Sequence, residues 1–169
     1  YDYPKAVAAS KKIMDDFDLD VQFDGVFYPG PLFDHVQFQS YRWPGGSPVL
    51  KDTQPFQAID AEFMPAEDYD ELIENVEMYM LKRYTPTVLP TFGGLQYLPT
   101  GVGTVELPFI APTCAQLANP EVQATLEAML KAGKLATEYM ESGGQITAHA
   151  ELVHGMPPLV GGVTKVPLD

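Results

Sequence analysis

Three segments of the chain place apolar residues at the spacing of an amphipathic helix. The first covers residues 4–17. The second begins at Pro65, carries acidic side chains in its first turns, where the helix dipole favours anions, and is expected to end at Pro86. The third begins at Asn119, a residue suited to a helix N-cap, and we expect the glycine pair within 142–144 to end it.

Shorter segments alternate between apolar and polar residues, as strands do. Residues 19–27 alternate most clearly, residues 36–43 alternate in part, and residues 103–110 are typical of a buried strand interrupted at Pro108. Helices and strands that follow one another along the chain indicate an α/β protein. Residues 29–65 contain six prolines, which forbid a long helix there. The segment is rich in aromatic residues, which favours an ordered excursion packed on a scaffold over a solvated linker; among them are Phe33, Phe38, Tyr41, Trp43 and Phe56.

Acidic side chains dominate the first half of the chain. The formal net charge is −13, of which residues 1–80 carry −11 and residues 81–169 carry −2. Such a field repels phosphate backbones and anionic lipid, so we expect neither nucleic acid nor a membrane surface as a partner. Most of these carboxylates are expected to lie on solvated helix faces.

The length and the cysteine content agree with one globular domain. A chain of 169 residues with 46% hydrophobic residues can bury a core, and no stretch is long and apolar enough for a membrane helix. The single Cys114 excludes an internal disulfide and indicates a reducing compartment, so we expect a cytoplasmic protein. We expect the Cys114 thiol to be buried and unreactive.

Two histidines near the C-terminus bracket an acid, with His149 and His154 flanking Glu151. Zinc ligands on one helix usually return to the same face after four residues. A spacing of five residues turns the second side chain by about 140° on a helix, and on a strand it reverses the face. The spacing therefore disfavours a metal site, and we interpret these residues as polar groups at the end of an element.

His35 and the pair Arg42-Trp43 are the best candidates for a ligand site. His35 follows a predicted strand end, where the reactive groups of α/β folds gather, although a loop or helix-start histidine would give the same sequence. Arg42 and Trp43 could hold an anionic or aromatic ligand by pairing and stacking. A structural pair between Arg42 and a carboxylate is an equal alternative.

Six segments, taken in order, carry a resemblance to a known family. They read FDGVFYPG (23–30), YRWPGG (41–46), AEFMPAEDYDELI (61–73), LPFIAP (107–112), NPEVQA (119–124) and GMPPLVGG (155–162), with KVPLD (165–169) continuing the last. In this order they resemble a divergent branch of the uroporphyrinogen decarboxylase superfamily, which includes haem-pathway decarboxylases and cobalamin-dependent methyltransferases. The resemblance covers nearly the whole chain.

The resemblance implies a (β/α)8 barrel of the TIM type. A complete barrel needs at least about 200 residues, so residues 1–169 would form a single partial domain. That domain would be the N-terminal portion of an incomplete barrel, with residues 29–65 as its Pro/Gly-rich excursion. The implied activity is decarboxylation of a tetrapyrrole or corrinoid-dependent methyl transfer, and we expect the piece alone to be inactive.

The resemblance also bears on the site, the cofactors and the partners. It implies a substrate at the barrel mouth, and we expect Tyr28, His35, Arg42 and Trp43 to line that mouth, while no catalytic residue and no metal ligand transfers. The chain lacks the Arg-rich N-terminal stretch and the Phe-Ser-Asp-Ile-like strand end of the decarboxylases, and the zinc-binding His and Cys set of the methyltransferases would lie beyond Asp169. No cofactor is therefore expected within this piece. Zinc and cobalamin would be cofactors of the full-length protein. The expected partners are a small-molecule tetrapyrrole or a corrinoid protein, together with a second copy in a homodimer.

A second hypothesis stays open beside the enzyme. A small acidic α/β domain could act as a non-enzymatic binding or scaffold module. That hypothesis predicts that residues 1–169 alone unfold cooperatively and remain monomeric, whereas an isolated half-barrel would expose sheet edges and associate.

Overall fold

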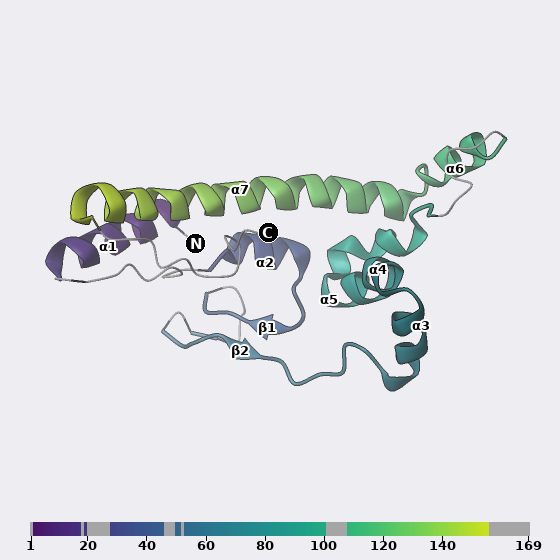
Figure 1. Cartoon of the computed structure of the whole chain (residues 1–169), viewed down its shortest axis with the longest axis horizontal. Coiled ribbons are helices and arrows are strands. Elements are labelled where there is room, and N and C mark those ends of the chain that lie inside the picture. The colour runs from purple at the N-terminus through teal and green to yellow at the C-terminus, as the bar shows by residue number, and fades with distance from the viewer. Residues whose placement is uncertain are drawn as a thin grey trace, which may run out of the picture. The chain divides into compact units, whose positions relative to one another are not determined.

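The computed structural model describes residues 2–17, 19, 28–45, 50–51, 53–100 and 108–155. The chain divides into two compact units. Unit 1 consists of Tyr1–Pro29 with Leu135–Asp169, and unit 2 is Gly30–Lys134. Of the described residues, 70% are helical (Figure 1).

Helix α1 (Tyr3–Asp16) confirms the helix predicted over residues 4–17. The Asp2 side chain caps its N-terminus by accepting a hydrogen bond from the Lys5 backbone N–H at 3.0 Å. Val7 and Met14 are buried seven residues apart, which is two helical turns and hence one face. The capped end and this apolar stripe together explain why the segment forms a helix.

Helix α7 (Pro120–His154) begins where the sequence predicted and ends ten residues later than predicted. Its start is capped by the Asn119 side chain, which accepts a hydrogen bond from the Glu121 backbone N–H at 2.9 Å. Gly143 and Gly144 lie inside the helix, because a glycine there costs only about 1 kcal/mol relative to alanine and removes no hydrogen bond. The helix ends at His154, and the φ of 63° at Gly155 lies in the left-handed region typical of a residue just past a helix end.

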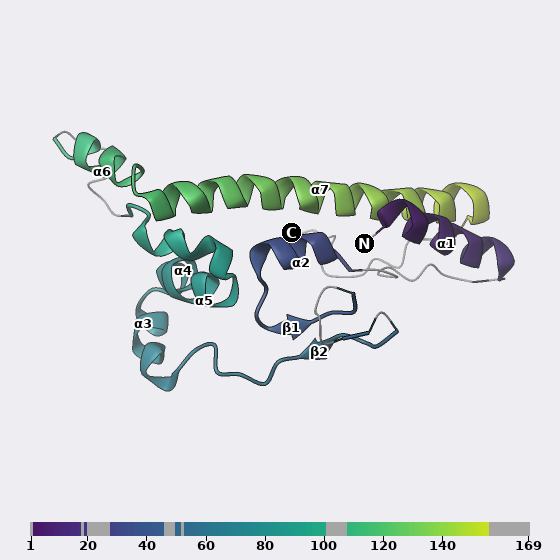
Figure 2. The ribbon, with the colours of Figure 1, turned by 180° about the vertical axis from the view of Figure 1, so that it is seen from behind.

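Unit 1 is built from α1 and the C-terminal part of α7, which lie side by side in both views (Figures 1 and 2). Their shared core contains Val7 and Met14 from α1 together with Ile146 and Ala150 from α7. At the start of α1, the rings of Tyr3 and Tyr139 lie 6.1 Å apart. Residue numbers therefore rise together along both helices, so the two helices run in the same direction.

The helix predicted from Pro65 is present as a series of short pieces rather than one rod. They are the 3₁₀ helix η1 (Ala66–Asp68), α3 (Tyr69–Glu74), α4 (Val76–Tyr79), the π-helix η2 (Met80–Tyr84) and α5 (Thr85–Val88). The break falls at Asn75, whose φ and ψ of −154° and 86° are not helical and whose side chain caps α4. Helical structure continues through Pro86, because a proline is tolerated in the first turn of α5.

The core of unit 2 forms where α4, the 3₁₀ helix η3 (Pro90–Tyr97) and the start of α7 bury their side chains. Tyr79, Leu95 and Val122 are 1%, 2% and 0% exposed. Beside Leu95, the Gly94 backbone N–H donates a hydrogen bond to Thr125 Oγ1 at 2.8 Å. By contrast, several apolar residues at helical spacing in the predicted Pro65 helix are exposed: Tyr69, Ile73, Val76 and Met80.

Most of the segment predicted as a strand at residues 36–43 takes another form. Val36 ends helix α2 (Gly30–Val36), and Gln37 turns the chain with a φ of 55°. Only Tyr41–Arg42 forms a strand, β1, which pairs antiparallel with β2 (Gln57–Ala58). The aromatic residues of this region form a chain of ring contacts. Their ring centroids lie 5.1 to 5.8 Å apart in four pairs: Phe33–Trp43, Phe33–Phe38, Phe38–Tyr41 and Tyr41–Phe56.

The expected α/β architecture, an incomplete (β/α)8 barrel, is wrong. The described residues are dominated by helix, and their sheet is a single antiparallel pair with two residues in each strand. A barrel requires parallel strands with apolar side chains buried on both faces, whereas all four residues of β1 and β2 are exposed. The strand predicted at 19–27 and most of the one predicted at 103–110 lie outside the described residues, and Ile110 begins helix α6 (Ile110–Gln116). Among the described helices, none has both the length and the apolar character needed to cross a membrane.

Candidate functional site

Three side chains from opposite ends of the sequence converge in unit 1. Asp15 lies in the last turn of α1, and His149 and His154 lie in the last two turns of α7. The Nε2 atoms of the two histidines each lie 2.8 Å from the same oxygen, Asp15 Oδ1. The two imidazole rings are 5.2 Å apart and inclined at 66°. Two imidazole nitrogens therefore lie within hydrogen-bonding distance of the same carboxylate oxygen.

The packing of α1 on α7 brings these groups together. Met14 and Ala150 belong to the same buried cluster, and each is adjacent in sequence to a member of the triad. Because α7 does not end at its glycine pair, His149 and His154 remain on one helix beside α1. Their spacing turns them about 140° apart around α7, and the carboxylate of Asp15 is the acceptor that both rings reach. The acid between them, Glu151, does not belong to the triad.

The electrostatics of the triad favour the ionised carboxylate. Hydrogen bonds from His149 first and His154 second lower the pKa of Asp15 below its ordinary value, against a smaller opposing effect of burial. The Asp15 side chain is 51% exposed, while those of His149 and His154 are 18% and 22% exposed. The donor atoms are thus accessible to solvent from the Asp15 side, and the rings are held by their packing.

This donor set suits a transition-metal ion. The Nε2 atoms of His149 and His154 and a carboxylate oxygen of Asp15 all lie within 4.8 Å of one another. Donors about 2.0–2.2 Å from a tetrahedral zinc are about 3.4 Å apart, so side-chain shifts of about 1 Å would complete the geometry. Imidazole and carboxylate together suit zinc, iron, nickel and cobalt, whereas calcium and magnesium prefer oxygen ligands alone.

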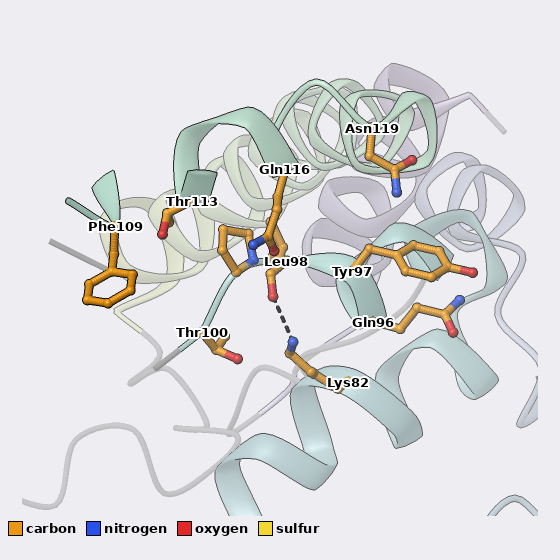
Figure 3. Close-up of a pocket in the computed structure, with 10 residues that line it drawn as sticks. Lys82, Gln96, Tyr97, Leu98, Thr100, Phe109, Thr113, Gln116 and Asn119 are labelled. Atoms are coloured by element: carbon orange, nitrogen blue, oxygen red, sulfur yellow. Dashed lines mark hydrogen bonds between the residues drawn. The ribbon is translucent and has the colours of Figure 1, made fainter. Parts of the chain in front are cut away.

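A second feature is a pocket of about 590 Å³ in unit 2, between η2, the end of η3 and α6 (Figure 3). Among the described residues of its lining, the one charged group is the Lys82 ammonium, which donates a hydrogen bond to the Leu98 carbonyl oxygen at 2.7 Å. The remaining lining is amide, hydroxyl and apolar: Gln96, Tyr97, Leu98, Pro99, Thr100, Phe109, Thr113, Gln116 and Asn119. The volume fits a small molecule, and Lys82 with the amide and hydroxyl side chains around it would suit a polar one. The described part of the lining contains no carboxylate, histidine or cysteine.

The four residues predicted at the substrate have different surroundings. Tyr28 belongs to unit 1, whereas His35, Arg42 and Trp43 belong to unit 2. His35 Nε2 lies 2.9 Å from the Ala128 carbonyl oxygen, which ties α2 to α7. Trp43 is buried against Phe33, while its neighbour Arg42 is exposed on β1. These contacts give His35 and Trp43 packing roles, and a role of the four residues in substrate binding stays a prediction.

Two interpretations of single residues change with the structure. Cys114, expected to be buried, is exposed on α6, because that helix buries none of its residues. His149 and His154, expected to be unrelated polar groups, meet at Asp15. The sequence carries a signal for two of the three ligands, the paired histidines. It carries none for Asp15, which lies 134 residues before the first of them.

Comparison with known proteins adds no assignment to this geometry. No family model, curated protein or solved structure matches the chain.

Proposed function

We propose that this chain binds a divalent transition-metal ion through Asp15, His149 and His154. The observation that carries the proposal is the convergence of two imidazole nitrogens on one carboxylate oxygen, each at 2.8 Å. Two imidazoles and a carboxylate supply the nitrogen and oxygen donors that zinc and its neighbours prefer.

Metal binding at this site would hold α1 on α7. The ligands come from both helices, so the ion adds a link between segments that are far apart in the sequence. An ion that binds only the folded chain stabilises it by about 2.7 kcal/mol at a concentration 100 times its Kd. For a chain of this size, that corresponds to a rise in Tm of about 5–11 °C.

The proposal is tested by titrating Zn²⁺ and Co²⁺ into the metal-free protein and measuring Kd by calorimetry and Tm by circular dichroism. We expect one ion per chain, the rise in Tm given above, and weaker binding on acidification, because protons compete with the metal for imidazole nitrogen. The variants Asp15→Asn, His149→Gln and His154→Gln should each weaken binding by at least about tenfold, since even outer-shell changes cost that much.

The matched control is Asp16→Asn. Asp16 neighbours Asp15 on α1, but its carboxylate pairs with Lys12 one turn earlier. This variant should bind the metal as the unchanged protein does. Equal weakening by Asp15→Asn and Asp16→Asn would show that the acidic surface attracts cations without a defined site, and would refute the proposal.

A second proposal rests on the sequence alone. The order of six segments supports a uroporphyrinogen decarboxylase-like enzyme in the intact protein, acting on a tetrapyrrole in the cytoplasm or exchanging methyl groups with a corrinoid protein. Its test is to supply the full-length protein with uroporphyrinogen and, separately, with methylcobalamin and zinc. Turnover of neither substrate would exclude both versions. The non-enzymatic alternative, an acidic binding module, agrees with the metal proposal and needs no such turnover.

A further inference from the structure

The triad offers three protein ligands, and this number has a chemical consequence. Among the described residues, the group of donor atoms around Asp15 contains His149 and His154 and no fourth histidine, cysteine or carboxylate. Structural zinc sites are closed by four protein ligands, whereas sites with three keep the fourth position for a ligand from solvent. The two-histidine, one-carboxylate set likewise leaves open positions on ferrous iron.

The charge of the triad selects the kind of ligand that would fill the open position. Two neutral imidazoles and one carboxylate cancel one of the two positive charges of a divalent ion, so the loaded site keeps a net charge of about +1. The nearest acid on α1, Asp16, is paired with Lys12, which reduces its opposition to an incoming anion. The wider acidic surface is screened beyond about 10 Å at 0.1 M salt.

The exposure of the triad gives such a ligand access. The Asp15 side chain is about half exposed, and neither histidine ring is fully covered. A small ligand can therefore approach the ion from solvent without any rearrangement of α1 or α7. These steps rest on the metal binding proposed above. We infer that the ion bound by Asp15, His149 and His154 keeps one coordination position open and takes a small anion there, of the carboxylate or azide class.

The experiment uses the Co²⁺-loaded chain, because the visible absorption of Co²⁺ reports its ligands directly. Azide is titrated at 0.1 M salt, and the cobalt content is measured again after gel filtration. We expect a saturable change in the visible spectrum with one azide per cobalt and with cobalt retained. Asp16→Asn should give the same titration, and His154→Gln should give neither stoichiometric cobalt nor the azide response.

The outcomes separate this inference from the one it rests on. If Co²⁺ does not bind stoichiometrically, the proposed metal site itself fails. If Co²⁺ binds but azide leaves its spectrum unchanged, the site is closed and the open position is refuted. Loss of cobalt from the protein on adding azide would also refute it, because the anion would then compete with the ligands instead of joining them.

Discussion

Replacing Gly94 with alanine should strongly destabilise unit 2, because no space exists there for a methyl group. A Cβ atom built on Gly94 would lie 2.1 Å from the Glu121 carbonyl oxygen and 2.7 Å from Thr125 Oγ1. The first contact is with the backbone of α7, which cannot rotate away as a side chain could. Helix η3 would have to move off α7, and the hydrogen bond from the Gly94 N–H to Thr125 would break.

Two costs add in this variant, and one gain opposes them. Forcing a methyl group into a packed contact costs about 1–3 kcal/mol. Leaving the buried Gly94 N–H without its acceptor costs about 1–3 kcal/mol more. Alanine lowers the conformational entropy of the unfolded chain, which stabilises the folded state by about 0.4–1 kcal/mol. The expected net loss in the free energy of unfolding is about 1–6 kcal/mol, with a middle value of about 3 kcal/mol, which is a large share of the 5–15 kcal/mol typical of a folded domain.

The neighbouring residue supplies the control for this experiment. A Cβ atom on Gly93 would meet nothing within 4 Å, so Gly93→Ala should leave the stability within about 0.5 kcal/mol of the original or raise it slightly. Urea unfolding is followed by the fluorescence of Trp43, the single tryptophan, which is buried in unit 2. For a loss of about 3 kcal/mol and a slope of about 2 kcal/mol/M, the Gly94→Ala midpoint should fall by about 1–2 M.

Equal midpoints for Gly94→Ala and Gly93→Ala would refute the packing of η3 against α7. If Gly94→Ala does not fold at all, Thr125→Val provides a milder test of the same contact. It removes the acceptor of the buried hydrogen bond and should cost about 1–3 kcal/mol, whereas Thr125→Ser keeps the hydroxyl and should cost less. Equal losses in the two Thr125 variants would contradict the role given to that hydrogen bond.

Two further predictions concern titrating groups. Burial and the 2.8 Å hydrogen bond to Asp68 raise the pKa of Tyr79 to about 12, so stability present below pH 10 should be lost as the pH rises towards 12. Ultraviolet absorbance should show Tyr79 ionising late, together with Tyr3, whose pKa is also raised by burial, and Tyr79→Phe should remove the part of that phase nearest pH 12. Because hydrogen bonds from His149 and His154 lower the pKa of Asp15, the metal-free chain should lose stability as the pH falls below about 4. Asp15→Asn should flatten the dependence of Tm on pH in that acid range, and an unchanged dependence would contradict the triad.

Local sequence signals predicted where helices begin more reliably than where they end. Asp2 and Asn119 cap α1 and α7 as their residue types suggest, since a short polar side chain can accept a hydrogen bond from the first turn. The end of α7 was misplaced because Gly143 and Gly144 weaken a helix without stopping it. Gly155 can adopt a left-handed φ and sits at the real end. Choosing among these glycines depends on what packs around them, and a single sequence does not contain that information.

The predicted strands show a different limit. Tyr41 and Trp43 alternate with polar neighbours, as they would on a strand. Trp43, however, is buried by contact with Phe33 on α2, and Tyr41 stays exposed while its ring contacts Phe38 and Phe56. Aromatic residues near one another in sequence can bury apolar surface by packing against each other, without forming the long hydrogen-bond ladder of a sheet. Alternation over a few residues therefore does not distinguish a strand from such a cluster, and the expectation of an α/β protein depended on that distinction.

The cluster of Asp15, His149 and His154 shows why a local spacing rule can overlook side chains that converge. The rule that ligands recur at four residues assumes that the metal lies directly over one helical face, with both ligands reaching outward. His149 and His154, about 140° apart around α7, point to the two sides of the line along which α1 approaches. A third ligand carried by that second helix can then lie between them, as Asp15 does at 2.8 Å from both Nε2 atoms. Two histidines five residues apart on one helix can therefore reach the same point when a side chain of the neighbouring helix lies between them. Whether a helix supplies it depends on contacts between residues more than 130 positions apart, such as that of Asp15 with His149.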